Sequence, residues 1–352
     1  MKMKKFLAAG LAASMVIGML AGCGSDGSSE SRKEAEAETE MEESNEEVAA
    51  EAADSSDGSL TEFKMTYVTW VGCAPLFIAQ EKGFFEEHGI KPELILNEDE
   101  SSGASLLYSN SVQAGSCVMD KVVLNYANGS EQKIALIFDE STGGDGIIAS
   151  EEIQSVEDLK GKKVGIDFAS TEYFFLHKIL MDHGMTFDDL DLQDMDASSA
   201  GASFIAGDLD AAVVWEPWLT NASQRDGGHV LVSSADYPRV IMDSLTVSRQ
   251  FAEEQPEAIE ALKEAWCDAI DYYNENPEEC VEIMARGLDL TVEDMEGMLP
   301  SVTFMGREEN AEFFNKANEE TVYSIAQDMA DFWADINPEV PADLDLTDLI
   351  VE

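Results

Sequence analysis

The stretch that decides the fold is Gln132 to Ser150, which reads QKIALIFDESTGGDGIIAS. It begins with an apolar run, Ile134 to Phe138, that is long enough for one buried strand. Acids, hydroxyls and two glycines interrupt this run, and a second apolar run follows at Gly146–Ala149. Glycines between two strands are also typical of an ordinary surface hairpin. Each side, however, is flanked by its own alternation of strand and helix patterns, which favours a strand that crosses between two lobes with a polar elbow in the cleft.

Strand and helix patterns alternate on both sides of this elbow, which predicts an α/β fold with mostly parallel sheets and helices on both faces. A second extended run, Val240–Ser248, predicts the return crossing to the first lobe. Helices dominate after it, with Phe251–Tyr273 and Asn310–Ile336 each expected as one long helix. The last segment, Asn337–Glu352, is expected to attach only loosely.

The first 22 residues have the pattern of an export signal. Three lysines precede an apolar core, Phe6 to Leu20, that is too short to span a membrane. The next residues, Leu20-Ala21-Gly22-Cys23, resemble a bacterial lipobox, in which Cys23 becomes the lipidated first residue of the mature chain. A plain secretory peptide with an incidental Cys23 is the alternative.

Residues 23–60 are expected to form a disordered acidic tether. Between Cys23 and Leu60 there are 13 acidic residues against Arg32 and Lys33, with almost no large apolar side chains. Such a segment cannot bury enough surface to offset the entropy of ordering. The whole chain has 21 basic and 72 acidic residues and a formal charge of −51, which argues against nucleic acid as a partner.

Cysteines and histidines give no sign of a metal site or cofactor. Besides Cys23, the cysteines are Cys73, Cys117, Cys267 and Cys280, at spacings that match no zinc pattern. The four histidines are scattered and form no HExxH motif. An exported chain can form disulfides, so whether Cys267 pairs with Cys280 stays open.

Several motifs along the chain are similar to those of solute-binding proteins of bacterial ABC importers, in the group that binds nitrate, sulfonates, taurine and thiamine-pyrimidine precursors. The order and spacing of these motifs carry the resemblance, rather than any single one. The most specific is the run from Ala206 to Trp218. The motifs read YVTWVG at 67–72, APLFIAQEKGFF at 74–85, DES at 139–141, GGDGI at 143–147, SVEDLKGKKV at 155–164 and AGDLDAAVVWEPW at 206–218.

The resemblance implies a two-lobed periplasmic-binding-protein-like fold of type II, with a helical C-terminal region. Lobe 1 would comprise 61–145 and 241–352, and lobe 2 would comprise 146–240. It further implies a monomer that binds a small molecule outside the cytoplasm, held on the outer face of the cell membrane by lipid on Cys23, and that delivers its ligand to a permease.

Candidate ligand-binding residues follow from the rule that ligands bind beyond the carboxyl ends of strands and at helix N-termini. Each also has a plainer alternative role, such as helix capping, hinge polarity or packing. In the first lobe and at its crossings the candidates are Trp70, Gly72, Cys73, Ser102, Asp120, Asp139, Glu140, Ser141 and Asp243. In the second lobe they are Thr171, Tyr173, Trp215, Glu216 and Trp218.

Two functions remain open at this stage. One is a receptor that closes on a small organic molecule, such as an amine, a nitrogen heterocycle or a sulfonate. The other is an envelope enzyme that acts through carboxylates in the cleft. Aromatic side chains and carboxylates dominate the candidate residues, which favours a cationic or nitrogen-rich ligand. No catalytic residue is predicted, because no histidine lies near Ser141 in the sequence.

Overall fold

The structure is a computed structural model that describes residues 59–97, 100–168 and 170–351. The expected signal segment, Cys23 and nearly all of the expected tether therefore lie outside the described residues. Among the described helices, none has both the length and the apolar character needed to cross a membrane.

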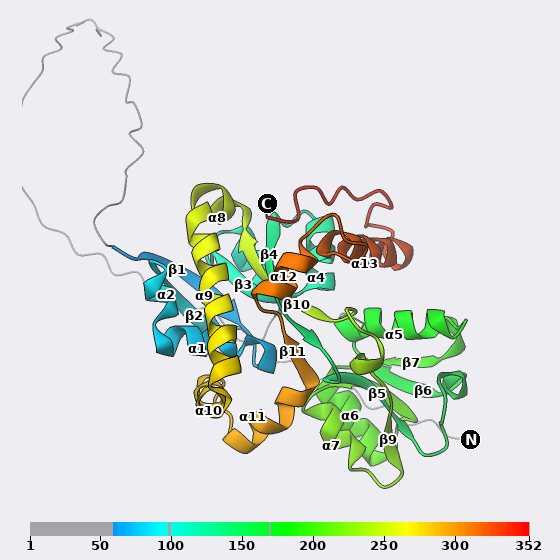
Figure 1. The fold of residues 1–352 in the computed structure, drawn as a ribbon. Coiled ribbons are helices and arrows are strands. Elements are labelled where there is room, and N and C mark those ends of the chain that lie inside the picture. The colour runs from blue at the N-terminus through cyan, green and yellow to red at the C-terminus, as the bar shows by residue number, and fades with distance from the viewer. Residues whose placement is uncertain (1–58, 98–99, 169, 352) are drawn as a thin grey trace, which may run out of the picture. The chain divides into compact units, whose positions relative to one another are not determined.

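The first of two sheets contains six strands in the order β11-β4-β10-β3-β1-β2. Strand β1 is parallel to β2 and β3, whereas β4, β10 and β11 pair antiparallel with their neighbours. Figure 1 shows β4 and β10 side by side in this sheet. The strands are β1 Thr61–Tyr67, β2 Ile90–Leu96, β3 Ala114–Val118, β4 Gln132–Ser141, β10 Met242–Ser248 and β11 Val302–Phe304.

The second sheet contains five strands in the order β7-β6-β8-β5-β9. Its strands are β5 Asp145–Ser150, β6 Lys163–Ile166, β7 Asp191–Asp194, β8 Ala211–Trp215 and β9 Gly228–Ser233. The two sheets share a strand order. In the first sheet the strands β2, β1, β3, β10 and β4 are successive neighbours, and in the second sheet β7, β6, β8, β5 and β9 are. In each sheet the fourth of these strands comes from a segment that crosses between the sheets. The inserted strand is β10 in the first sheet and β5 in the second.

The elbow predicted at Gln132–Ser150 connects the two sheets. Strand β4 ends at Ser141 in the six-stranded sheet, and β5 begins at Asp145 in the five-stranded sheet. The alternative, a surface hairpin, is wrong, because β4 and β5 do not pair. The chain returns to the first sheet between β9 and β10, as the second extended run predicts. The exact lobe boundaries stay a prediction.

Both sheets are mixed, so the expectation of mostly parallel sheets is wrong. The inserted strands cause the difference: β10 is antiparallel to β3 and β4, and β5 is antiparallel to β8 and β9. Parallel neighbours need a long crossover connection, usually a helix. A strand that enters from the other sheet has no such connection and can run the opposite way.

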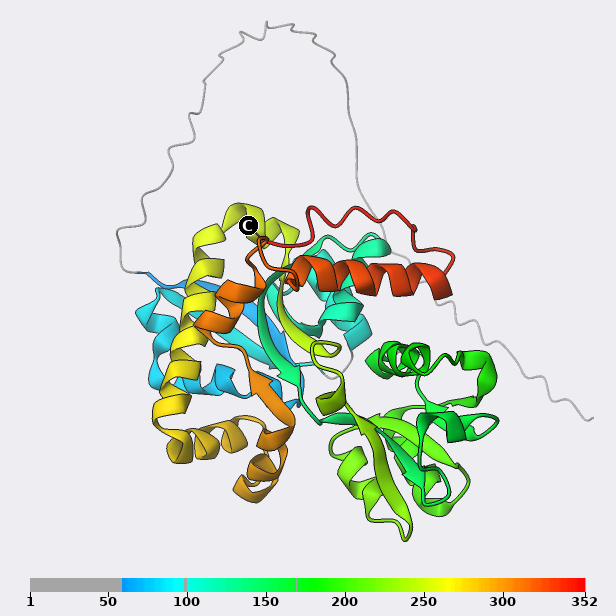
Figure 2. The same ribbon diagram turned by 45° about the vertical axis from the view of Figure 1, so that its right-hand side comes forward.

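Helices cover the sheets and extend the C-terminal region. Helix α9 packs along α1 and α2, and α13 packs against α4 (Figures 1 and 2). The helices are α1 Pro75–Lys82, α2 Phe84–Glu87, α3 Glu100–Tyr108, α4 Met119–Ala127, α5 Thr171–Asp182, α6 Ala197–Ala206, α7 Trp218–Ser223, α8 Arg249–Glu254, α9 Pro256–Glu275, α10 Pro277–Gly287, α11 Val292–Met298, α12 Arg307–Phe313 and α13 Val322–Ile336.

Two of the long helices expected from the sequence are each split in two. The run Phe251–Tyr273 is divided between α8 and α9 at Gln255, because Pro256 has no N–H with which to continue the preceding helix. The run Asn310–Ile336 is divided between α12 and α13, and Thr321 caps α13 by accepting from the backbone N–H of Ser324. The short strand β11, which the sequence did not reveal, precedes α12.

The core of the six-stranded sheet lies on both of its faces. Phe138 of β4 contacts Trp266 of α9, with ring centroids 4.4 Å apart, while Ile134 and Ile137 of the same strand pack with α13 and α4.

Cys267 and Cys280 are buried free thiols, so the disulfide that the sequence left open is not formed.

The C-terminal tail is docked, in contrast to the expected loose attachment. Leu349 and Ile350 are buried, and the backbone of Ile134 donates to Leu349 and accepts from Val351. The tail thereby covers the edge of β4 beyond β11. Covering an edge strand satisfies backbone groups that would otherwise invite pairing with another chain.

Asn310 of α12 covers the middle of the same edge. Its side-chain oxygen accepts from the backbone N–H of Ile137 at 2.9 Å, and its amide nitrogen donates to the Ile137 carbonyl at 2.9 Å. The amide also donates to the carbonyls of Met305 and Gly306, both at 3.0 Å. The side chain therefore takes the place of a neighbouring strand at this one residue.

We expect Asn310→Ala to lower the free energy of unfolding by about 2–3 kcal/mol, because it leaves the buried N–H and carbonyl of Ile137 without partners. Urea denaturation measures the change. Asn274→Ala, at an exposed position of α9, is the control and should stay within about 0.5 kcal/mol of the unaltered protein. A loss for Asn310→Ala no larger than that of the control would contradict this role.

Candidate functional site

The candidate site centres on a hydrogen bond between two of the residues predicted from the sequence, Trp70 and Asp139. Trp70 follows β1, and Asp139 lies near the carboxyl end of β4. The indole Nε1–H donates to Asp139 Oδ1 at 3.0 Å. Asp139 is fully buried, and its other oxygen, Oδ2, has no hydrogen-bond partner.

Burial sets the electrostatics of Asp139. Loss of water around the carboxylate raises the pKa of Asp139 to about 7, against a lowering effect of the Trp70 hydrogen bond. The charges of Asp145 and Glu140 raise it further. A buried carboxyl group with one unsatisfied oxygen is costly, so the presence of an acid here points to a role other than stability.

Two glycines make room for this pair. A Cβ on Gly72 would lie 1.9 Å from Asp139 Oδ2 and 2.5 Å from Trp70 Nε1, so any side chain there would displace the carboxylate or the indole. A Cβ on Gly144, in the elbow, would lie 2.6 Å from the indole ring of Trp70. The ring is thus fixed between its hydrogen bond to Asp139 and the backbone of the elbow.

Ser141, another sequence candidate, joins the elbow to the second sheet. Its hydroxyl donates to Asp145 Oδ2 and lies 2.8 Å from the hydroxyl of Ser234. Ser234, which follows β9, also accepts from the backbone N–H of Gly143 at 2.7 Å. Both chain crossings therefore meet at one small polar cluster.

A buried carboxyl pair extends this cluster into α5. Asp145 hydrogen-bonds to Glu172, which also hydrogen-bonds to Ser170 at the start of the helix. Burial raises the pKa of Asp145, and burial together with the charge of Asp145 raises the pKa of Glu172 well above its ordinary value. Burial and mutual repulsion therefore both favour the protonated forms of these two carboxyl groups.

The candidates Asp120 and Thr171 also contact each other. The Thr171 hydroxyl, at the start of α5, donates to Asp120 Oδ1 at 2.7 Å. Lys121 Nζ lies 3.9 Å from Asp120 Oδ2 and 4.8 Å from the centre of the Trp333 ring. Burial raises the pKa of Asp120, and the positive charge of Lys121 opposes this.

Cys73 and Asp243 lie on the other side of Asp139. Asp243 of β10 is the residue directly opposite Asp139 of β4 in the strand register. The thiol of Cys73 donates to the Ser116 hydroxyl at 3.1 Å. Burial, and then the charges of Asp243 and Asp139, raise the pKa of Cys73, so this thiol is neutral and unreactive.

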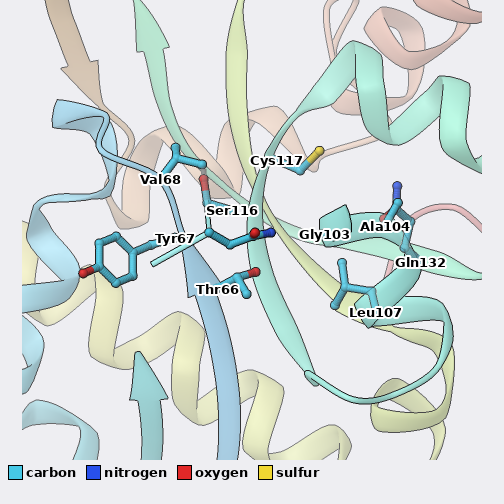
Figure 3. A pocket seen from close by; sticks show the side chains of 10 residues that line it. Thr66, Tyr67, Val68, Gly103, Ala104, Leu107, Ser116, Cys117 and Gln132 are labelled. Carbon is cyan, nitrogen blue, oxygen red and sulfur yellow. The ribbon is translucent and has the colours of Figure 1, made fainter. Parts of the chain in front are cut away.

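A small pocket lies at the carboxyl ends of β1 and β3 and is lined in part by Ser116, the hydrogen-bond partner of Cys73 (Figure 3). It holds about 10 Å³ of space, close to the size of one water molecule. Figure 3 shows Thr66 and Val68 on one side, Gly103 and Leu107 of α3 on the other, and Ser116 between them. The carboxyl end of the parallel strands is the edge at which the fold rule places a ligand.

Six sequence candidates make contacts that do not include the Trp70–Asp139 hydrogen bond. Tyr173 stacks on Phe187, with ring centroids 4.2 Å apart. Trp215 and Trp218 pack on the apolar cluster around α6 and α7. Glu216 accepts hydrogen bonds from the backbone N–H and the hydroxyl of Thr220. Glu140 accepts one from the backbone N–H of Arg239. The Ser102 hydroxyl donates to the side-chain oxygen of Asn97.

Sequence reasoning missed Gly144, Asp145 and Ser234 as members of the site. Asp145 and Gly144 lie in the quoted elbow, so their position in a crossing segment was a usable signal. Ser234 is buried and follows β9 without any motif, and only the fold brings it to Ser141.

Comparison with known proteins gives consistent matches. A model of the family described as "NMT1/THI5 like" matches residues 70–280, more than half of the chain. The chain is 26% identical over 216 residues to the taurine-binding periplasmic protein of Escherichia coli, covering 58% of this chain and 67% of that protein.

Solved structures share the fold. The periplasmic aliphatic sulphonate-binding protein of Escherichia coli aligns with a TM-score of 0.70 at 20% identity, over 83% of this chain and 98% of that one. The periplasmic nitrate-binding protein of Synechocystis aligns with a TM-score of 0.61 at 16% identity, over 81% of this chain and 83% of that one. The periplasmic-binding-protein fold expected from the sequence is therefore confirmed.

We expect Gly72→Ala to destabilise the protein by about 1–3 kcal/mol, because the new methyl group overlaps the Asp139 carboxylate. Thermal unfolding measures the effect. Gly297→Ala is the matched control: it lies in α11 with open space around the added methyl, and should be neutral or stabilising by up to about 1 kcal/mol. Equal stability of the two variants would show that Gly72 is not needed for close packing.

A second expectation concerns pH. The folded protein holds a proton on Asp139 up to about pH 7, whereas the unfolded chain loses it near its ordinary value of 3.8. The folded state binds more protons between these values, so this group's contribution to stability falls as pH rises through that window. We therefore expect Asp139→Asn to gain stability relative to the unaltered protein between pH 5 and pH 8 in urea denaturation.

The exposed Asp226 supplies the control for this pH series, because Asp226→Asn should keep the pH dependence of the unaltered protein. Parallel profiles for all three proteins would mean that Asp139 ionises normally in the folded state.

Proposed function

The chain belongs to the NMT1/THI5-like family, and on this basis we propose that it is the solute-binding component of an ABC importer. It acts outside the cytoplasm as a monomer, closes two lobes on a small organic molecule and delivers that molecule to a permease. The relatives named above bind taurine, aliphatic sulphonates and nitrate. For this chain the candidate ligands are amines, nitrogen heterocycles and sulfonates.

One observation carries the proposal: the buried polar site coincides with the chain crossings between the two sheets. Asp139 lies in the first sheet and Trp70 follows its strand β1, while Asp145 lies in the second sheet and Ser234 follows its strand β9. Ser141 contacts both Asp145 and Ser234. A molecule that contacts this group touches both sheets next to the segments about which they can rotate. Such contacts favour the closed arrangement by the difference in affinity between open and closed states.

An enzyme acting through the buried carboxyl groups is the second candidate function. The buried Asp145–Glu172 pair, in which the pKa of both carboxyl groups is raised, is the observation in its favour. The Ser141 hydroxyl, however, contacts Asp145 and Ser234 rather than a histidine base. The family relatives named above are binding proteins, which also favours the receptor. Mass spectrometry after incubation with a bound compound separates the two functions, because a receptor retains it unchanged.

We expect a true solute to stabilise and compact the protein. A ligand at a hundred times its dissociation constant adds about 2.7 kcal/mol by mass action, so a thermal-shift screen of small metabolites will reveal it. Small-angle scattering of the same sample should then show a smaller radius of gyration. Saturation without any compaction would contradict closure of the lobes, and the absence of any stabilising metabolite would contradict the receptor function itself.

The membrane tether is part of the proposal and rests on residues 20–23. We expect Cys23→Ser to release the protein from the membrane fraction, because lipid on this residue would anchor the chain. Solute affinity should be unchanged, since the site lies beyond residue 59. Fractionation followed by immunoblotting checks the prediction, and a variant that stays in the membrane fraction would contradict it.

A further inference from the structure

We propose that Asp139 and Trp70 form a subsite for a protonated, N–H-bearing nitrogen of the solute. The inference rests on the proposed function and deepens it, because it names the chemical class of the ligand at this end of the site. The expected ligand group is a primary or secondary amine, or a similar cationic N–H donor. A ligand that is only an anion is not expected to bind at this subsite.

The balance of buried charge supports a cationic partner. Among the described residues, the buried charged side chains are six carboxyl groups and one lysine: Asp120, Asp139, Glu140, Asp145, Glu172, Asp243 and Lys121. Lys121 lies beside Asp120 at 3.9 Å, at the contact with Thr171. A small anion brought to Asp139 would meet Asp243 opposite and Asp145 and Glu140 nearby, and would be repelled.

The orphan oxygen of Asp139 identifies the group that is missing. Asp139 Oδ1 accepts from Trp70, while Oδ2 is buried without a hydrogen-bond partner. Once Asp139 is ionised, this oxygen can only accept a hydrogen bond, so a ligand that binds the carboxylate here supplies a donor. The hydrogen bond is strongest when the donor is charged. A quaternary nitrogen has no N–H and cannot satisfy this oxygen.

The indole of Trp70 completes the subsite. Its N–H is held by Asp139, and its ring lies against the backbone of Gly144, so its orientation is fixed before any ligand arrives. The side chain is half-buried and keeps part of its surface available. A cation near the face of a tryptophan ring is attracted by the ring's electron density, and the neighbouring carboxylate adds to this attraction.

A metal ion fits these residues less well than an organic cation does. Within the described ranges, no group of three or more His, Cys, Asp or Glu side chains has a geometry that could hold a metal ion. The neighbouring thiol, Cys73, donates to Ser116 and is neutral, so it is not a metal ligand in this state. An N–H cation, in contrast, needs only one acceptor oxygen and an aromatic neighbour.

The test compares amines with analogues in which a hydroxyl replaces the amino group. Isothermal titration calorimetry is performed at pH 7.5 with taurine and isethionate, β-alanine and 3-hydroxypropionate, and benzylamine and benzyl alcohol. We expect at least one amine to bind and to bind at least tenfold more tightly than its hydroxyl analogue. N-Trimethylation of that amine should remove most of the gain.

Asp139→Asn links this selectivity to the proposed subsite. The variant keeps the shape of the side chain and an oxygen for Trp70 but loses the charge. We expect it to bind the amine about 10- to 100-fold more weakly, the usual loss for a hydrogen bond to a charged group, and to bind the hydroxyl analogue unchanged. Asp226→Asn, at an exposed position, should keep the selectivity of the unaltered protein.

The outcomes distinguish this inference from the function on which it rests. If a sulfonate or other compound without nitrogen binds as tightly as its amine partner, or if Asp139→Asn retains amine selectivity, the subsite is wrong while the receptor function stands. If no amine in the panel binds, the subsite is also wrong. Failure of every metabolite in the thermal-shift screen would overturn the receptor function as well.

Discussion

A single hydrogen bond, from the indole of Trp70 to a fully buried carboxyl group on Asp139, constrains the centre of this molecule. The bond satisfies one carboxyl oxygen and leaves the other without a partner. It requires the absence of a side chain at Gly72, where a Cβ would overlap the carboxylate, and at Gly144, where it would overlap the ring. Local stability alone would favour an apolar side chain in place of such an acid.

The same residues lie where the chain passes between the two sheets. Both sheets insert a strand from a crossing segment at the equivalent place in their order, which makes them structurally similar halves. The crossings meet at Ser141 and Ser234, and Asp145 carries the contact on to Glu172 of α5. A change in charge or hydrogen bonding at Asp139 would therefore act next to the chain crossings between the two sheets. In the proposed receptor, this position would couple ligand recognition to lobe closure without a separate relay.

Much of the fold could be predicted from the sequence, because it depends on local patterns. The apolar runs of β4 and β5, separated by acids and glycines, correctly indicated a crossing between two sheets. Three features depended on non-local pairing and were missed: the antiparallel insertion of β10 and β5, the strand β11, and the docking of the tail on Ile134. A short strand such as β11 carries no periodicity and exists only because the edge of β4 is available to it.

The candidate site was predictable to a similar extent. The rule of strand ends selected Trp70, Gly72 and Asp139, and the structure brings these three residues together. Sequence could not distinguish these from Tyr173 or Trp218, since an aromatic side chain near a strand end serves packing and recognition equally well. Their ligand roles stay a prediction.

The most direct test of this account is the titration of the Asp139 side-chain carboxyl carbon by NMR, in the free protein and after saturation with a bound amine. We predict a pKa of about 7 in the free protein, because the group is buried with one oxygen unsatisfied. We also predict a marked fall in this pKa when the amine binds, because a cationic donor stabilises the carboxylate. An ordinary pKa in the free protein, or one that saturation leaves unchanged, would contradict the account.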